Sequence, residues 1–344
     1  PPPPPPPLFF FKQKTANELS LGLVGSEMCI RDRLNPNLQV EISGLRFKNP
    51  VLTASGTFGY GLEFERFFDI SELGGFCTKG LSLEPMKGAP PGRIQETPSG
   101  MLNAIGLENV GVEGFIKEKL PRLANFQGHI VANVLGKSIQ EFVAIAERLA
   151  PCDKVSALEL NISCPNIKEG GIEFGHDPEM TFAVVEAVKK HSNHPIWVKL
   201  SPNVTDIRVF ARACQDGGAD AITLVNTFVG MSIDVDKCRP MLSNTTGGLS
   251  GPAIRPLAVR LVHAVAEAVS IPIIGIGGIS TTRDALEFMI AGASAIQIGT
   301  ANFYEPTVSL KVILGLRQHC LDQKVDSIKE LIGTLCIEKG QFFY

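Results

Sequence analysis

Three features are missing from the sequence, and each would have indicated a different class of protein. No apolar run reaches the roughly 18–20 residues that a membrane-spanning helix needs. The formal charge is -3, from 32 Lys and Arg against 35 Asp and Glu, which argues against a nucleic-acid-binding protein that relies on positive charge. The 8 cysteines have no regular spacing, which indicates free thiols in a reducing cytoplasm and argues against a disulfide framework.

Two further absences concern cofactors. The chain has no C-x-x-C pair and its 6 histidines show no ligand spacing, so we expect no metal and no iron–sulfur cluster on this chain. No G-x-G-x-x-G follows a predicted strand, which argues against a dinucleotide-binding domain. Hydrophobic residues make up 44% of the chain and charged residues 19%, so a large core can be buried.

The two ends of the chain differ from the rest. A polyproline tract at 1–7 is followed by an apolar patch and then by Lys12 and Lys14, which is the wrong order for a signal peptide. The stretch after it also resembles translated read-through of a sequencing adaptor. We therefore expect an extraneous or disordered segment at 1–33, one domain at 34–336, and a tail without an assigned role at 337–344.

From Pro50 onward, short apolar runs alternate with longer amphipathic ones. The predicted strands are rich in Val, Ile and Leu, as parallel strands covered on both faces are. They lie at 51–54, 75–79, 130–134, 157–162, 196–200, 221–226, 272–276 and 295–298. Helices are predicted at 111–124, 139–149, 178–191, 204–216, 253–269, 282–291 and 306–323.

This repetition predicts an α/β protein with a (β/α)8 TIM barrel, built as a single domain with loop insertions. The insertions are two irregular stretches at about 81–110 and 228–251. The alternative is a doubly wound open sheet, which rarely needs eight such units.

Chemistry in such a barrel lies at the C-terminal ends of the strands, and all eight predicted strands end in polar or glycine residues. One such ending is ordinary turn chemistry, but eight together indicate a polar site on one face. Gly277-Gly278 and Gly299-Thr300 follow strands seven and eight, where many barrels bind phosphate through backbone N–H groups.

Two lysines and four asparagines suggest what the site binds. Lys79 and Lys199 lie on strands that reach the same mouth, and a buried lysine is unfavourable without an anionic partner. They predict a bound carboxylate or a reduced flavin, unless one of them pairs with a buried carboxylate such as Glu159. Asparagine offers both a donor and an acceptor, which suits the edges of a flat heterocycle. The four are Asn103, Asn133, Asn161 and Asn226.

One cysteine stands at the predicted mouth. Cys164 follows the fourth strand directly, whereas Cys214 and Cys320 fit buried packing inside helices. A thiolate at the mouth is able to remove a proton from a weakly acidic carbon.

Six motifs, in the same order, resemble those of dihydroorotate dehydrogenase over residues 34–335. They are ASGTFG at 54–59, TKG at 78–80, NAIGLEN at 103–109, NISCPN at 161–166, GIGGI at 275–279 and QIGT at 297–300. The NISCPN motif is that of the soluble class with a cysteine base; the membrane-bound class carries serine there. IGLEN at 105–109 and KEGG at 168–171 resemble the catalytic subunit of the NAD-linked, two-subunit type. The single-chain, fumarate-dependent type is the alternative.

The resemblance implies a set of ligands and roles. FMN would contact Ser55, Lys79, Gly80, Asn133, Asn161, Lys199, Val225, Gly251, Gly277, Gly278, Gly299 and Thr300. Dihydroorotate or orotate would contact Lys79, Asn103, Ala104, Ile105, Gly106, Leu107, Asn161, Asn226 and Thr227. Cys164 would be the base in the oxidation of dihydroorotate to orotate in pyrimidine (UMP) biosynthesis.

The resemblance also implies partners. Electrons would pass to NAD through an electron-transfer subunit with FAD and a [2Fe–2S] cluster, bound to a homodimer core. A dihydrouridine synthase, another FMN barrel with a cysteine base, is a further alternative. It acts on tRNA and would need a cationic docking surface, which the net negative charge disfavours.

Overall fold

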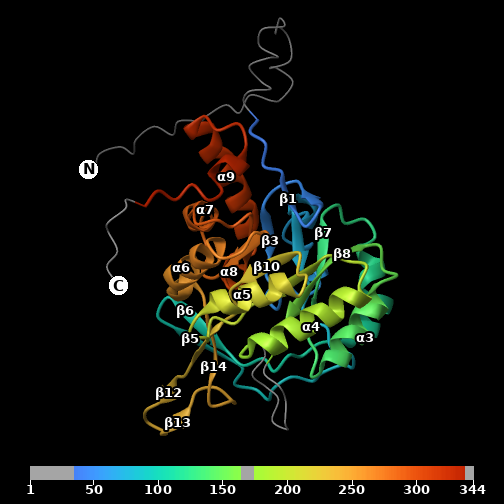
Figure 1. The fold of residues 1–344 in the computed structure, drawn as a ribbon. Coiled ribbons are helices and arrows are strands. Elements are labelled where there is room, and N and C mark those ends of the chain that lie inside the picture. The colour runs from blue at the N-terminus through green and yellow to red at the C-terminus, as the bar shows by residue number, and fades with distance from the viewer. Residues whose placement is uncertain (1–34, 164–173, 338–344) are drawn as a thin grey trace, which may run out of the picture.

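The structure, a computed structural model, describes residues 35–163 and 174–337. The expected segment at 1–33 lies outside these ranges, as do Cys164 and all of the expected tail at 337–344 except Ile337. The described residues form a barrel of strands surrounded by helices (Figure 1).

The barrel forms because eight apolar segments, buried on both faces, pair in parallel. They are β3 (Val51–Thr53), β4 (Gly75–Cys77), β7 (His129–Val134), β8 (Val155–Asn161), β9 (Ile196–Lys199), β10 (Ala221–Leu224), β15 (Ile273–Ile276) and β16 (Ala295–Ile298). Each strand is hydrogen-bonded to the next of these in chain order, and β16 bonds back to β3. The predicted (β/α)8 TIM barrel is confirmed, and the open sheet is wrong because a closed barrel has no edge strand.

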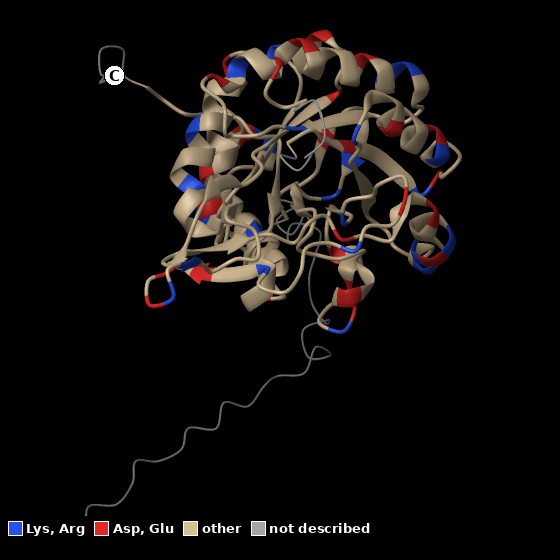
Figure 2. Cartoon of the chain, turned by 90° about the horizontal axis from the view of Figure 1, so that it is seen from below, with Lys and Arg blue, Asp and Glu red and all other residues tan. Residues whose placement is uncertain are grey.

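Amphipathic helices cover the outside of the barrel, and Figure 2 shows them as a ring with charged residues on its outer side. They include α3 (Ile139–Leu149), α4 (Pro178–His191), α5 (Ile207–Asp216), α6 (Arg255–Ala266), α7 (Thr282–Ile290) and α9 (Val308–Gln323). The predicted starts are confirmed where a side chain caps the first turn. Asp177 accepts a hydrogen bond from the backbone N–H of Glu179, and Thr281 forms a capping box with Asp284.

Some predicted helix bounds are wrong for local reasons. The helix predicted at 204–216 begins at Ile207, because Asp206 is its N-cap. The pattern at 253–269 consists of a 3-10 turn, Pro252–Ile254, followed by α6.

The segment predicted as one helix at 111–124 is also divided. Pro121 has no backbone N–H to continue an α-helix, and the last turn is a 3-10 turn that starts beside it. The three parts are α2 (Gly111–Gly114), the π-helical turn Phe115–Lys119 and the 3-10 turn Leu120–Leu123. Other short helical segments are α8 (Ala301–Tyr304) and the 3-10 turns Leu62–Phe64, Ile70–Glu72 and Ile328–Leu331.

The two insertions are more regular than the sequence predicts. They contribute β5 (Ile94–Thr97), β6 (Gly100–Asn103), β11 (Phe228–Gly230) and β14 (Gly247–Ser250). These strands form an antiparallel sheet in the order β11-β14-β6-β5, in which Asn103 pairs with Gly248. A further hairpin, β12 (Ile233–Asp234) and β13 (Arg239–Pro240), extends away from the barrel (Figure 1). The prediction of irregular loops is wrong because each insertion forms an antiparallel pair of strands, β5 with β6 and β11 with β14, and the pairing of β6 with β14 joins the two insertions.

The opposite end of the barrel is closed by the hairpin of β1 (Val40–Ile42) and β2 (Leu45–Phe47). Trp197, at the start of β9, donates a hydrogen bond from Nε1 to Oγ of Ser43 at 3.0 Å. The ring of Phe47 is fully buried and contacts the Trp197 ring. Any ligand therefore has to enter at the C-terminal ends of the strands.

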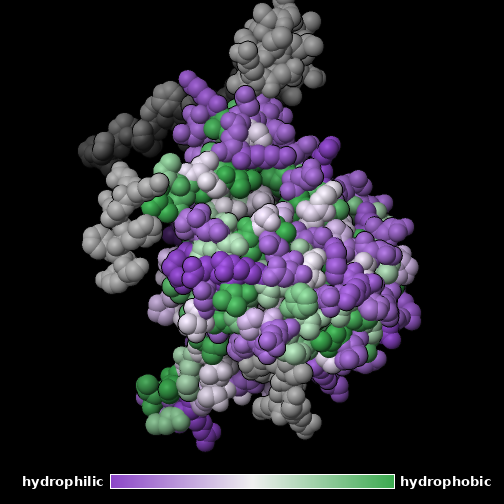
Figure 3. Space-filling view, viewed as in Figure 1, coloured by the Kyte–Doolittle hydropathy of each residue, from purple (hydrophilic) through white to green (hydrophobic). Residues whose placement is uncertain are grey.

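The described surface is mixed in polarity (Figure 3). Large exposed apolar side chains gather on the projecting hairpin and the strand before it, among them Val229, Met231, Ile233 and Val235. None of the helices in 35–163 and 174–337 has both the length and the apolarity to cross a membrane.

Candidate functional site

The strand register places several predicted site residues on the inner face of the barrel. Asn133 of β7 lies opposite Glu159 of β8, and Lys199 of β9 lies opposite Asn161 of β8. Residues paired across neighbouring strands, or two apart on one strand, share a face. These four side chains therefore lie on one face, and the bonds of Glu159 described next place that face inside the barrel.

Glu159 is the centre of this inner layer and is fully buried. Its Oε1 accepts hydrogen bonds from Nδ2 of Asn133 at 2.8 Å and from Sγ of Cys77 at 3.2 Å, and its Oε2 accepts one from Nε2 of Gln297 at 2.8 Å. Nζ of Lys199 lies 4.0 Å from Oε1. The alternative considered above, in which one lysine pairs with Glu159, is thus confirmed for Lys199. We call Cys77, Asn133, Glu159, Lys199 and Gln297 the polar floor.

Two acceptor atoms of the polar floor have no partner in the described part of the chain. They are Oδ1 of Asn133 and Oε1 of Gln297, both buried. Leaving a buried acceptor unpaired costs about 1–3 kcal/mol. Oδ1 of Asn133 lies next to Gly80, 3.3 Å from where a Cβ on that glycine would be. The floor is therefore suited to a ligand that brings N–H groups.

Lys79 follows β4 and is half-buried. Its backbone N–H donates to the carbonyl oxygen of Gly59 at 2.8 Å. Its side chain forms no ion pair with any other described residue, so its charge is available to a ligand. Ser55, after β3, is also half-buried.

Three glycine-containing loops meet at one side of the mouth. Gly251 has φ +93 and Gly278 has φ +73, and a Cβ on Gly278 would lie 2.7 Å from the Gly251 carbonyl oxygen. Oγ1 of Thr300 donates to Oγ of Ser250 at 2.8 Å. The backbone N–H groups of Gly278 and Gly299 have no backbone acceptor among the described residues. Proteins bind phosphate through unpaired backbone N–H groups in glycine-containing loops, where no side chain prevents the close approach of the backbone.

The three loops include the four residues predicted to bind phosphate, Gly277, Gly278, Gly299 and Thr300, and also Gly251, which was predicted to contact FMN. Gly277 has φ +137 and packs against α6, where a Cβ would lie 2.7 Å from Cβ of Ala258. We call the set the glycine cradle: Gly251, Gly277, Gly278, Gly299 and Thr300.

The predicted pyrimidine-binding residues at 103–107 continue from β6. Nδ2 of Asn103 donates to the carbonyl oxygen of Gly248 at 3.1 Å. Gly106 and Leu107 have φ values of +73 and +59, and a Cβ on Gly106 would overlap the backbone of Ala89. The tight backbone path therefore requires glycine at 106.

Asn109 holds this loop in place, although the sequence analysis gave it no role. It is buried, its Nδ2 donates to the carbonyl oxygen of Leu107 at 2.8 Å, and its Oδ1 accepts from the backbone N–H of Gly111 at 2.7 Å. Arg93 and Glu108 add an ion pair of 2.6 Å. The only signal of the role of Asn109 in the sequence is its place in the NAIGLEN motif.

The remaining predicted residues lie between the loop and the floor. Nδ2 of Asn226 donates to Oδ1 of Asn161 at 3.2 Å, and the backbone N–H of Thr227 donates to Oδ1 of Asn226 at 2.8 Å. The backbone N–H of Val225 donates to Ile276 on the neighbouring strand. These contacts join the ends of β8, β10 and β15. Cys164, the predicted base, lies outside the described residues.

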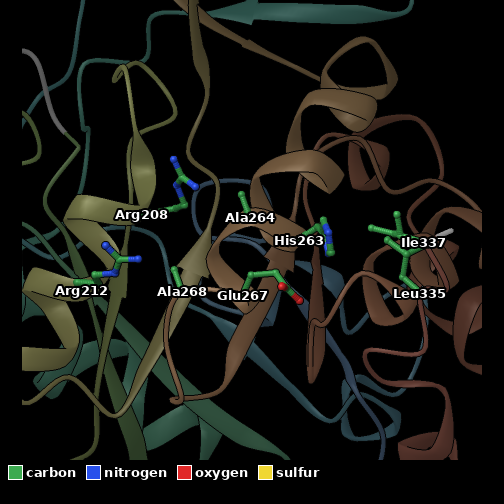
Figure 4. A pocket seen from close by; sticks show the side chains of 8 residues that line it. All are labelled: Arg208, Arg212, His263, Ala264, Glu267, Ala268, Leu335 and Ile337. Atoms are coloured by element: carbon green, nitrogen blue, oxygen red, sulfur yellow. The ribbon is translucent and has the colours of Figure 1, made fainter. Parts of the chain in front are cut away.

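A separate hollow of about 560 Å³ lies on the outer side of the barrel. Arg208 and Arg212 of α5 face His263 and Glu267 of α6 across it, and the C-terminal segment with Ile337 lies at its far side (Figure 4). None of the predicted site residues that the structure describes lines this hollow. Among the described residues there is also no group of three or more His, Cys, Asp or Glu side chains arranged to hold a metal ion.

Comparison with known proteins shows the family. A family model described as "Dihydroorotate dehydrogenase" matches residues 37–320, which include all eight barrel strands and the glycine cradle. The chain belongs to the dihydroorotate dehydrogenase family. The resemblance predicted from the six motifs is therefore confirmed, and the chain is placed in a family of oxidoreductases.

Curated members of the dihydroorotate dehydrogenase family match nearly the whole barrel. The chain is 52% identical over 300 residues to a protein of Citrifermentans bemidjiense and to one of Geobacter sulfurreducens, each match covering 87% of this chain and 98% of the relative. A protein of Thermoanaerobacter sp. is 49% identical over 302 residues, with 88% and 100% covered. All three are named "Dihydroorotate dehydrogenase B (NAD(+)), catalytic subunit".

Proposed function

We propose that the chain is an FMN-dependent catalytic subunit that oxidises dihydroorotate to orotate in pyrimidine biosynthesis. The observation that carries this proposal is the polar floor with its two unpaired acceptors, lying at the mouth of a barrel of this family beside a glycine cradle. The functional unit that we propose is the barrel domain of residues 34–336.

FMN fits the groups that the chain offers. Its phosphate suits the glycine cradle, where a side chain would prevent close approach of the backbone. Its ring carries an imide N–H, which suits the unpaired Oδ1 of Asn133. The ring-binding residues in this proposal are Ser55, Lys79, Gly80, Asn133, Asn161, Lys199 and Val225. When bound, FMN supplies an acceptor for the hydride at C6 of dihydroorotate.

The residues of this chain supply the rest of the chemistry. We propose that Cys164 removes the proton from C5. Lys199 is buried and cationic, so it stabilises negative charge that develops above the floor, an effect that is strong where water is excluded. Lys79, Asn161 and the loop at 103–107, together with Asn226 and Thr227, orient the pyrimidine ring and its carboxylate.

Electrons have to leave the site for catalysis to continue. The names of the relatives refer to NAD(+) and to a catalytic subunit, which supports a partner subunit and favours the NAD-linked type over the single-chain, fumarate-dependent type. We propose that the partner carries FAD and a [2Fe–2S] cluster and binds a homodimer core of this chain. Co-expression with a flavin and iron–sulfur subunit, followed by mass measurement of the complex, tests this assembly.

Anaerobic mixing tests the activity itself. The purified yellow protein is mixed with dihydroorotate, flavin absorbance is followed, and NAD or fumarate is then added. We expect the flavin to bleach, and to be reoxidised by NAD only when the partner subunit is present. A flavin that stays oxidised would contradict the substrate, and rapid reoxidation of the isolated chain by fumarate would favour the single-chain type.

A further inference from the structure

Glu159 occupies a position from which it bonds to much of the barrel. From β8 it receives hydrogen bonds from side chains on β4, β7 and β16, and it faces Lys199 on β9. Both carboxylate oxygens are used, and every hydrogen-bond partner donates to them. Toward each of these side chains Glu159 therefore acts only as a hydrogen-bond acceptor.

An acceptor-only group determines how an amide next to it is turned. The amides of Asn133 and Gln297 both direct their NH2 groups to Glu159, which leaves the carbonyl oxygen of each for something else. Those two oxygens are the buried acceptors that lack a partner among the described residues. Neither amide has another side-chain hydrogen bond in 35–163 or 174–337. Glu159 alone therefore sets the orientation of both.

We propose that Glu159 is a positioning residue that determines which hydrogen-bonding groups the polar floor presents. By taking both NH2 groups, it leaves two carbonyl oxygens for a heterocycle that carries a ring N–H. This inference rests on the proposed function, in which the heterocycle is the FMN ring and the N–H is at N3. Glu159, although it is part of the polar floor, is fully buried and need not touch the flavin.

The variant E159Q tests this because it changes the donor pattern at nearly constant volume. Asn133 donates to Oε1 of Glu159 and Gln297 donates to Oε2, and in a glutamine one of these two atoms becomes an NH2 group, which cannot accept a hydrogen bond. At least one of Asn133 and Gln297 must then turn its NH2 group toward the ring, where it meets the N3–H donor to donor.

The measurement is the affinity of the full chain, freed of flavin, for FMN and for N3-methyl-FMN. The wild-type protein should bind FMN at least tenfold more tightly, because the methyl group removes the N–H that the floor accepts. In E159Q this preference should fall to about threefold or less. If the role of Glu159 is only structural, E159Q should weaken the binding of FMN and of N3-methyl-FMN equally, and the ratio of the two affinities should stay unchanged.

E186Q provides the matched control, because Glu186 is a half-exposed carboxylate on α4 and lies outside the site. The ratio of the FMN affinity to the N3-methyl-FMN affinity in E186Q should equal that of the wild type. If E159Q does not fold, N133A and Q297A test the same point, since each removes one of the oriented oxygens. At least one of them must lower the ratio.

Three results would overturn the inference: a wild-type ratio near one, an unchanged ratio in a folded E159Q, or unchanged ratios in both N133A and Q297A. These outcomes are distinct from a failure of the proposed function. A wild-type protein that binds no FMN, or whose bound FMN is not bleached by dihydroorotate, contradicts the proposed function instead.

Discussion

Replacing Lys199 by methionine is expected to lower the free energy of unfolding by about 3–5 kcal/mol. Nζ of Lys199 lies 4.0 Å from Oε1 of Glu159, and the two side chains are 7% and 0% exposed. Two unit charges at that distance attract each other by about 4 kcal/mol at an effective dielectric constant of about 20. Methionine fills a similar volume but leaves the Glu159 carboxylate buried without a countercharge, which is the origin of the loss.

The assay is urea unfolding followed by circular dichroism, applied to K199M, E159Q and the double variant. Each single variant leaves one charge buried alone, whereas the double variant leaves none and should recover most of the lost stability. K190M is the matched control. Lys190 pairs with Glu186 at 2.9 Å, but these side chains are 63% and 45% exposed, so its loss should stay below about 1 kcal/mol.

Two results would refute the reasoning. One is a K199M protein whose stability lies within about 1 kcal/mol of the wild type, which would show that the pair is screened like a surface pair. The other is a double variant whose loss equals the sum of the two single losses, because independent sites add and a coupled pair does not.

Four further predictions concern the thiols and the glycine cradle. C164A should remain yellow but should not reduce its flavin with dihydroorotate in stopped-flow measurements; bleaching at the wild-type rate would contradict the assignment of the base. Burial raises the pKa of the Cys77 thiol well above its ordinary value of 9.0, so in the folded protein maleimide should label the exposed Cys238 at neutral pH but not Cys77. The unfolded chain ionises Cys77 near its ordinary pKa while the folded chain keeps the proton, so this thiol should make stability fall as pH rises above about 9; equal stability of wild type and C77A at every alkaline pH would contradict this. G278A should lower FMN affinity at least tenfold in a binding titration, because the added Cβ meets a carbonyl oxygen at 2.7 Å; Gly44 has a similar φ of +76 but open space around it, so G44A should leave the affinity unchanged.

Much of the site could be predicted because its residues end apolar strands. Lys199, Asn133 and Asn161 are polar groups at or near the ends of segments that are mainly apolar, and that contrast is local. The roles of Gln297 and Cys77 were missed because each lies within a buried strand, where a single polar residue has no local signal of its partner. The role of Cys164 stays a prediction, since it lies outside the described residues.

The insertions show the same limit. The stretches 94–103 and 228–250 show no clear apolar alternation, so neither predicts a strand by itself. They become strands because they pair, as in the Asn103 contact with Gly248, whose partners are 145 residues apart. The sheet and the loop that follows it at 104–109 thus depend on a long-range pairing.

Local patterns were enough for the barrel, the caps of its helices and the face on which the polar residues lie, because apolar periodicity and capping are properties of neighbouring residues. They could not show which polar groups meet. Glu159 and Gln297 are 138 residues apart, yet they share a hydrogen bond because strand closure brings β8 and β16 around the same axis. Barrel closure also excludes water, so the buried Glu159 carboxylate accepts its hydrogen bonds from Asn133 and Gln297 and thereby orients these two amides of the polar floor.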